Sequence, residues 1–553
     1  MSFFKDLDLR KLGMQLLVAS IITLSVSAIG MVELFGGRFV ITGLFTMAQI
    51  LFLGPTAFFA YRAAQGAPAG KKWLGMLKAL LLGVGVGIVM FTFVWLAQNF
   101  DVRSVFINIS PRLINILTFE HAGGATTLFL ALVGSALAGG ALALVPDKLR
   151  KALLLGASIT LLVGLLSEIL AERLRSLFSS QLSSAIIASK ALQVIPATVL
   201  FVLVSAISYL RQSGRIGTGP KVGANLKPNQ AKIVRTALIS LLLLVLPMLL
   251  GSYLTEVTNN IGLFFLMGLG LNIVVGLAGL LDLGYVAFFA IGAYTMAALT
   301  STGHLGVAGI SFWVALPICV AVAAMAGFIL GMPVLRMRGD YLAIVTLGFG
   351  EIIRILALSD LMKPYIGGAQ GILNIPKPTV GDLALIRPEQ MYYVILIGVA
   401  IAMFMSTRVR DSQIGRRWMA MREDEDVAEA MGINLVNTKL LAFTIGAGFS
   451  GLAGAIFASK LGSIFPHSFN LLISINVLSL IIVGGLGSIP GTLVGAIILV
   501  GLPELLREFA EFRWLAYGVL LVTMMLSRPE GFIPSETIKR ELHAGDEAAE
   551  QAG

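Results

Sequence analysis

Residues Arg408–Lys439, with the sequence RVRDSQIGRRWMAMREDEDVAEAMGINLVNTK, form the most highly charged stretch of an otherwise apolar chain. Apolar runs at 391–407 and 440–459 flank this stretch, and each falls within the roughly 17–25 residues that a membrane-spanning helix needs. We therefore interpret Arg408–Lys439 as a cytoplasmic loop that joins two membrane spans and carries a short helix.

The composition of the whole chain is typical of a membrane protein. Of its 553 residues 57% are hydrophobic and only 13% are charged, whereas soluble domains average about 25% charged residues. The sequence predicts an all-α, polytopic transmembrane helical bundle of about sixteen spans. The predicted spans are 12–32, 39–61, 77–97, 125–145, 152–170, 191–210, 236–254, 261–281, 284–301, 311–334, 341–359, 391–407, 440–459, 471–487, 491–507 and 514–527. We treat the first run as a retained span, because no small-residue cleavage site follows it.

Lys and Arg residues set the predicted orientation. If the N-terminus is cytoplasmic, most basic residues outside the spans also fall on the cytoplasmic side, as the positive-inside rule requires. Both termini are therefore predicted to be cytoplasmic, and the net charge of +10 is not a nucleic-acid signal. The predicted divisions are an N-terminal transmembrane extension at 1–210, a basic cytoplasmic linker at 211–235, a second transmembrane block at 236–530 and a polar cytoplasmic tail at 531–553.

Nucleotide, metal and catalytic sites are not predicted in this chain. The stretch Gly446-Ala-Gly448-Phe-Ser-Gly451 fits G-x-G-x-x-G, but a dinucleotide site needs that pattern between a strand and a helix. Here it lies inside a predicted span, so we interpret its glycines as sites of close helix packing. The four histidines and the single cysteine, Cys319, form no metal-ligand or nucleophile–base pattern. We expect no enzyme activity and no cofactor bound by this chain, so an ATP-driven function would need a separate subunit.

Two features within or between predicted spans leave alternatives open. Glu351 and Arg354 are three residues apart, so they share one helix face and can pair. Ionisable groups at membrane depth are costly and often functional, although an ion pair that only fixes helix packing is equally possible. The glycine-rich stretch GGLGSIPG at 484–491 is either an unwound segment of the kind transporters use at substrate sites or an ordinary tight loop.

Asn272, Tyr285, Phe288 and Phe289 lie in a region rich in glycine and alanine. Such a helix pair can line a substrate path, with the aromatic rings as a constriction, and together with Glu351 these four residues are our candidates for that path. The alternative is tight helix packing in which polar groups cap a turn at Asp282.

The acidic run 423–426 is predicted to open a short helix of two to three turns, because carboxylates are favoured at the positive end of the helix dipole. Val427 and Met431 are four residues apart and are expected to form a small apolar face with Ala428 and Ala430. A glycine then ends the helix. A helix of this length is marginal alone, so it is either a docking surface for a partner or a solvated connector on the membrane.

Several motifs together resemble the permeases of branched-chain amino-acid ATP-binding-cassette (ABC) importers, and in particular the LivM-type subunit. The motifs are Arg422-Glu-Asp-Glu425 with Ala428 and Gly432-Ile433, the run LRMRGDYLAIVTLGFGEIIR at 335–354, LNIVVGLAG at 271–279 and VGGLGS at 483–488. The resemblance covers about 236–533, so the 236–530 block is identified as an ABC importer permease domain. Residues 1–235 are a long extension compared with the compact members of that family.

The resemblance implies a multi-subunit importer in the bacterial inner (cytoplasmic) membrane. A LivM-like and a LivH-like permease pair there, two ABC ATPase subunits carry the ATP and Mg, and a periplasmic amino-acid-binding protein delivers leucine, isoleucine or valine. It implies transport of these or related amino acids by alternating access, without a nucleic-acid partner. The residues that would contact the ATPase are Arg422, Glu423, Asp424, Glu425, Ala428 and Gly432. The outer segment 361–390 would receive the binding protein.

Two readings from other classes remain open at this stage. An ion-coupled secondary transporter or channel would work without ATPase subunits, although the sparse intramembrane charge argues against it. A membrane scaffold or assembly subunit would give the N-terminal extension a role.

Overall fold

The structure is a computed structural model that describes residues 8–67, 72–100, 103, 106–119, 124–177, 180–188, 190–213, 228–334, 337, 340–507 and 512–535. Of these described residues 78% are helical, which confirms the predicted all-α class. Ten helices of the described part are long and apolar enough to cross a membrane, or eleven if the bent pair Asp147–Leu165 and Ser167–Arg175 counts as one more span. Three shorter apolar helices lie at Val286–Thr300, Ile489–Leu505 and Phe512–Ser527.

The predicted count of sixteen spans is not confirmed, because hydropathy detects apolar length and not where a helix bends or begins. The predicted spans 236–254 and 261–281 fall largely in one element, α12, which bends at Gly251 where φ is +75°. The predicted span 39–61 begins with two short strands, so its helix starts only at Met47.

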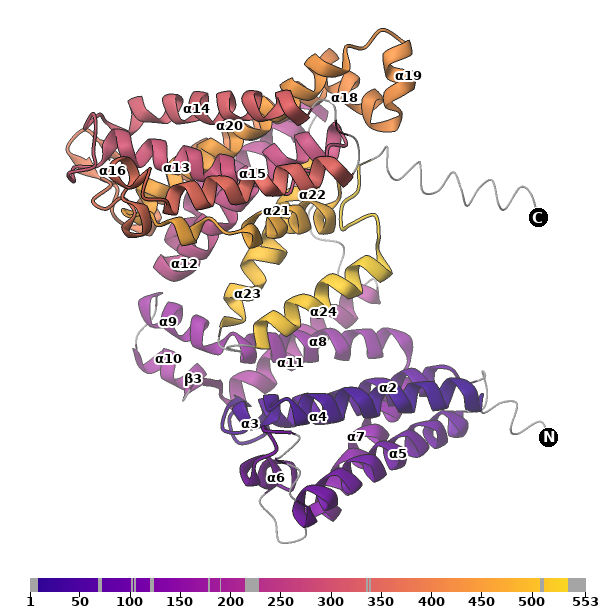
Figure 1. Ribbon diagram of the computed structural model, residues 1–553. Coiled ribbons are helices and arrows are strands. Elements are labelled where there is room, and N and C mark those ends of the chain that lie inside the picture. Colours follow the sequence, from indigo (N-terminus) through magenta and orange to yellow (C-terminus); the bar gives the residue numbers. More distant parts are fainter. Residues whose placement is uncertain are drawn as a thin grey trace. The chain divides into compact units, whose positions relative to one another are not determined.

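The chain forms two compact units, Met1–Arg235 and Thr236–Gly553 (Figure 1). The elements of the first unit are α2 (Leu9–Ala28), α3 (Met31–Leu34), β1 (Phe39–Ile41), β2 (Phe45–Thr46), α4 (Met47–Gln65), α5 (Lys72–Asn99), α6 (Pro111–Leu117), α7 (Gly124–Leu144), α8 (Asp147–Leu165), α9 (Ser167–Leu177), α10 (Ser180–Ile186), β3 (Ile187–Ala188), β4 (Ala191–Leu192) and α11 (Val194–Gln212). The strands make a small sheet in the order β2-β1-β4-β3, in which β1 and β4 are parallel. Helices α4, α5 and α7 pack around one apolar core.

The second unit holds the family-like region, and its elements continue the numbering. They are α12 (Pro228–Leu271, which begins before the unit boundary), η2 (Asn272–Leu277), α13 (Val286–Thr300), α14 (Phe312–Val334), α15 (Asp340–Leu358), α16 (Lys363–Ile366), η3 (Gly368–Gln370), β5 (Thr379–Val380), β6 (Leu383–Ala384), α17 (Pro388–Arg410), α18 (Gln413–Glu423), α19 (Glu425–Ala430), α20 (Leu435–Leu461), η4 (Pro466–Ser468), α21 (Leu471–Gly484), α22 (Ile489–Ala496), η5 (Ile497–Gly501), α23 (Leu502–Leu505) and α24 (Phe512–Ser527).

Helix α20 is the most buried span of this unit, and α13 and α14 lie against it (Figure 1). The close approach depends on glycine. An added Cβ at Gly451 would lie 2.3 Å from the Cβ of Ala323 on α14, and one at Gly292 on α13 would lie 2.3 Å from the oxygen of Gly451. The packing interpretation of the Gly446–Gly451 stretch is therefore confirmed.

The glycine-rich stretch at 484–491 is a short turn between α21 and α22. Gly485 and Gly487 have φ values of +121° and +74°, which glycine adopts without a steric penalty. The Ser488 hydroxyl accepts a hydrogen bond from the Gly491 amide and caps α22. Asp282 caps its own turn in the same way, because its Oδ1 accepts a hydrogen bond from the Gly284 amide at 2.9 Å.

Before α17 begins at Pro388, the segment 361–390 contains only short elements, α16, η3 and the β5–β6 hairpin. The backbones of Ile372 and Ile464 bond to each other, and Lys377 donates to the backbone oxygen of Lys460 at the end of α20. These bonds attach the segment to the C-terminal end of α20, whereas α18 and α19 precede the N-terminal end of that helix. Most of the predicted linker (214–227) and of the predicted tail (536–553) lies outside the described residues.

Candidate functional site

The charged loop folds into two short helices, α18 and α19, between the spans α17 and α20. Ser412 caps α18, since its hydroxyl accepts hydrogen bonds from the Ile414 and Gly415 amides. Asp424 is extended (φ −157°), ends α18, and accepts hydrogen bonds from the Asp426 and Val427 amides at 2.9 and 3.0 Å. The predicted short helix is present as α19, and acidic residues open it, but it begins at Glu425 and has only six residues because Asp424 lies outside it as its cap. The preceding helix α18 was not predicted.

Helix α18 is fixed to the transmembrane bundle at two points. Trp418 is fully buried, and its indole nitrogen donates to the Thr438 backbone oxygen at 2.8 Å. Arg422 donates from Nη1 to the Gly276 backbone oxygen, at the end of η2, at 2.7 Å. The Arg422 side chain also covers Gly279, where an added Cβ would lie 2.8 Å from its Cγ. Sequence reasoning missed Trp418, although an aromatic residue inside a charged loop was an available signal.

Helix α19 is held by a salt bridge to α20. The Lys439 ammonium lies 2.7 Å from a Glu425 carboxylate oxygen, and the two side chains are 4% and 24% exposed. Ala428, on the inner side of α19, is buried and only 3% exposed. Gly432, with φ at +85°, turns the chain after α19, and its amide donates to the Glu429 oxygen. The predicted helix stop at this glycine is confirmed.

The outer surface of α19 carries two large apolar side chains. Val427 is 59% and Met431, the residue that follows the helix, is 79% exposed. Ala428 points inward and Ala430 is exposed, so the predicted single apolar face is wrong in one respect: Ala428 belongs to the buried side. The exposed pair lies on a helix whose other side is fixed, which is the arrangement a docking surface needs.

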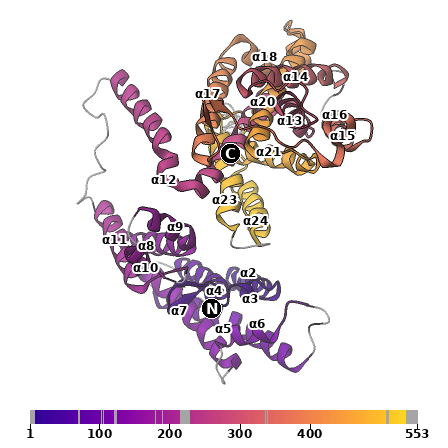
Figure 2. The same ribbon diagram turned by 90° about the vertical axis from the view of Figure 1, so that its left-hand side faces the viewer.

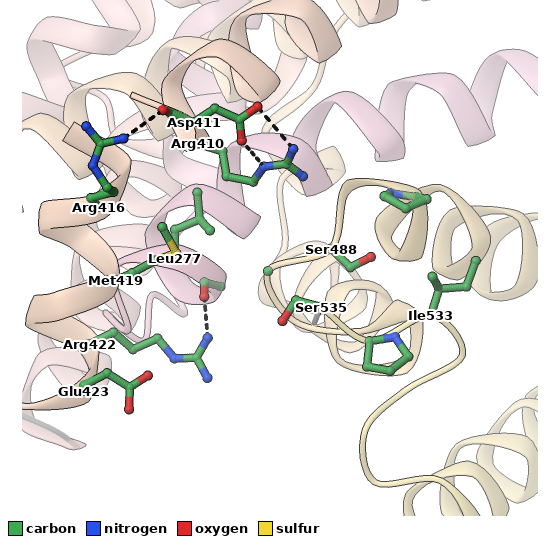
Figure 3. Close-up of a pocket in the computed structure, with 14 residues that line it drawn as sticks. Leu277, Arg410, Asp411, Arg416, Met419, Arg422, Glu423, Ser488, Ile533 and Ser535 are labelled. Atoms are coloured by element: carbon green, nitrogen blue, oxygen red, sulfur yellow. Dashed lines mark hydrogen bonds and ion pairs between the residues drawn. The ribbon is translucent and has the colours of Figure 1, made fainter. Parts of the chain in front are cut away.

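A cavity of about 550 Å³ lies beside α18 (Figure 3). Its walls are formed by Gly276, Leu277, Arg410, Asp411, Arg416, Met419, Arg422, Glu423, Gly487, Ser488, Pro490, Ile533, Pro534 and Ser535. Figure 3 shows Arg422 and Glu423 on one wall and Ser488 and Ser535 on the other. Arg410 donates to the Asp411 carboxylate at 2.8 Å, and this bond holds the pKa of that carboxyl below its ordinary value.

The predicted path residues Asn272 and Tyr285 are buried and make hydrogen bonds over long sequence distances. Asn272 is 2% exposed, and its Oδ1 accepts from the Gly487 amide at 2.8 Å. The Tyr285 hydroxyl donates to the Gly446 oxygen at 2.8 Å. These contacts join η2 to the glycine-rich turn and α13 to α20.

Phe288 and Phe289 are also buried, with ring centroids 5.9 Å from Phe349 and 5.0 Å from Phe457 respectively. Glu351, on α15, pairs with Arg354, as its spacing predicted. The Glu351 side chain is 44% exposed on the outer face of α15. The roles of all five residues in a substrate path stay predictions.

The second unit is similar to known transport permeases. The family described as "Branched-chain amino acid transport system / permease component" matches residues 253–527. The LivM permease proteins of the high-affinity branched-chain amino acid transport systems of Salmonella typhimurium and Escherichia coli are each 41% identical to this chain. The matches cover 55% and 57% of this chain and 76% and 78% of the two relatives.

A second type of permease is also related. The LivH permease protein of the Escherichia coli system is 25% identical over 312 residues, which are 52% of this chain and 97% of LivH. No solved structure matches the chain. With its many apolar helices, this multi-pass membrane chain belongs to the family of branched-chain amino acid transport permeases, with LivM-type members among its relatives.

Proposed function

We propose that this chain is the LivM-like permease subunit of an ABC importer in the bacterial inner membrane. Its cargo would be leucine, isoleucine, valine or a related amino acid. A LivH-like permease would stand beside it, two ATPase subunits would supply ATP hydrolysis with Mg, and a periplasmic binding protein would deliver the substrate. Both termini would be cytoplasmic, in accordance with the positive-inside rule.

The observation that carries the proposal is the exposed apolar surface on a firmly anchored α19. Val427 and Met431 project from it, while Asp424 caps the helix and Glu425 fixes it to Lys439. The chain itself shows no nucleotide motif in its sequence. A partner that covers Val427 and Met431 would bury the 59% and 79% of these residues that are exposed, which would contribute about 1–2 kcal/mol each. We assign this surface to the ATPase, with Arg422, Glu423, Ala428 and Gly432 shaping it.

Alternating access would follow from the attachment of α18 to the bundle. Movement of α18 and α19 by a closing ATPase dimer would pull on the end of η2 through Arg422 and Gly276. Packed elements of this kind shift between discrete arrangements rather than deform continuously. The path residues Asn272, Tyr285, Phe288, Phe289 and Glu351 lie on η2, on or beside α13, and on α15.

The test is reconstitution of this chain with its second permease, ATPases and binding protein in proteoliposomes. ATP supplied on the ATPase side should drive uptake of radiolabelled leucine, and uptake should require the binding protein. A cation gradient with the chain alone should give none. Uptake by the chain alone under that gradient would replace the proposal with an ion-coupled transporter.

Replacement of Arg422 by alanine should lower ATP-driven uptake about tenfold in that system. A hydrogen bond to a charged group contributes roughly 1.5–3 kcal/mol, and here it joins α18 to η2. ATPase subunits should still co-purify, because Val427 and Met431 remain on α19. Arg417→Ala is the matched control, since Arg417 is an exposed arginine of the same helix. Equal uptake by the two variants would show that the Arg422 contact carries no coupling.

A further inference from the structure

Helix α15 carries an ion pair in the middle of an apolar span. The candidate span is Tyr341–Leu358, and Glu351 lies two residues past the centre of the helix. Glu351 and Arg354 bond to each other, yet their side chains are 44% and 31% exposed. Ionised groups at the centre of a bilayer are costly, and they almost always face other protein segments or water rather than lipid. This face of α15 is therefore poorly suited to contact lipid acyl chains.

The inner side of α15 packs against α13 and α21 and buries Leu342, Ala343 and Thr346. Figure 2 shows α15 at the edge of the second unit. The other side presents residues spaced alternately by three and four, the spacing of a seam between two helices. This outer face consists of Tyr341, Ile344, Gly348, Glu351, Ile355 and Leu358.

The outer face is shaped for a helix rather than for lipid. Tyr341, Ile344 and Ile355 are 74%, 65% and 53% exposed. Gly348 lies between them, and an added Cβ there would meet nothing within 4 Å. A bare glycine flanked by large apolar residues lets a second helix approach closely in a membrane, and polar groups on such a face are found toward protein interiors.

We propose that the outer face of α15 is the seam on which the LivH-like second permease packs, covering the Glu351–Arg354 pair. The occupant is chosen on two grounds. The relatives of this chain include both LivM and LivH permeases, and LivH is related over 97% of its own length. Two subunits of one fold pair most readily around a two-fold or nearly two-fold axis, with matching surfaces in contact. The partner element is then the LivH helix that corresponds to α15. This inference rests on the two-permease assembly proposed above.

Cysteine cross-linking in the complete transporter tests the seam. In a Cys319→Ala background, Ile344→Cys and Ile355→Cys should each form a disulfide with single cysteines placed along the corresponding LivH helix. Ile329→Cys on α14, where the native side chain is 59% exposed, is the control and should form none. Homodimers of this chain through Ile344→Cys would assign the face to a second copy and overturn the proposal. Cross-linking at Ile329 alone would place the seam on α14.

A second experiment places a large side chain at Gly348 on the outer face of α15. Gly348→Leu should reduce the LivH-like subunit recovered with this chain about tenfold, which corresponds to about 1.4 kcal/mol of affinity, since the leucine side chain would keep the second helix from approaching closely. Gly518→Leu on α24 is the matched control, because an added Cβ at Gly518 also meets nothing within 4 Å. Undiminished recovery with Gly348→Leu would overturn the seam.

Removing the Glu351–Arg354 ion pair tests whether the outer face of α15 contacts a protein partner or lipid. Glu351→Leu with Arg354→Leu should leave the chain inserted but weaken its recovery with the second permease. If the face met lipid, the double variant would keep its partner and gain thermal stability, which would overturn the proposal. Failure of the wild-type chain to recover any second permease would instead refute the two-permease function, so the two failures are distinguishable.

Discussion

ATP-driven uptake should fall about tenfold or more when Glu425 is replaced by alanine, with the chain still inserted and the ATPases still hydrolysing ATP. The variant leaves the Lys439 ammonium, 4% exposed, without the carboxylate 2.7 Å away. Removing one partner of a buried ion pair costs roughly 3–5 kcal/mol. Because Glu425 is a quarter exposed, solvent screening lowers the expected cost to about 2 kcal/mol. A loss of that size makes detachment of α19 from α20 roughly thirtyfold more frequent, because 1.4 kcal/mol is a factor of ten.

Uptake and ATP hydrolysis, measured together in the reconstituted transporter, separate coupling from assembly. Glu429→Ala, at an exposed position of the same helix, is the matched control and should transport normally. The double variant Glu425→Leu with Lys439→Leu should recover part of the uptake, since an apolar pair leaves no uncompensated charge. Wild-type uptake by Glu425→Ala would mean that the salt bridge plays no part in energy transfer.

Replacement of Gly292 by alanine should strongly destabilise the second unit. The new methyl group would lie 2.3 Å from the oxygen and 2.5 Å from the Cα of Gly451 on α20. Both are backbone atoms, so no side chain can move aside and α13 must separate from α20. Overpacking typically costs about 1–3 kcal/mol, and this rigid backbone contact should fall at the upper end. We expect a lower midpoint of thermal unfolding in detergent.

The single cysteine of the chain offers a direct probe of this unfolding. Cys319 is fully buried on α14, and its oxygen lies near Gly451, so a thiol-reactive dye should label it only when α14 and α20 separate. Gly518→Ala is the control, because its methyl group meets nothing within 4 Å and alanine favours helix by roughly 1 kcal/mol over glycine. An unchanged midpoint for Gly292→Ala would contradict the close packing of α13 on α20.

Sequence reasoning was most successful where the signal is local. The apolar runs identified the membrane class, and the motifs around Gly432 and at 335–354 identified the family that the comparisons support. The pairing of Glu351 with Arg354 followed from a spacing of three on a helix. The count of sixteen spans was not confirmed, because a bend at Gly251 and the small strands before α4 leave the hydropathy of a run unchanged.

The charged loop Arg408–Lys439 shows the same difference between local and long-range features. Its charge, its short helix and the stop at Gly432 are properties of neighbouring residues, and the sequence by itself determined them. The bond between Trp418 and Thr438, the salt bridge between Glu425 and Lys439, and the contact of Arg422 with Gly276 join residues 20, 14 and 146 positions apart. Only the tertiary structure decided these contacts, and with them which side of α19 is buried and which is exposed. The physical reason is that a side chain's burial depends on the helix packed against it, and that helix is chosen by the folding of the whole unit.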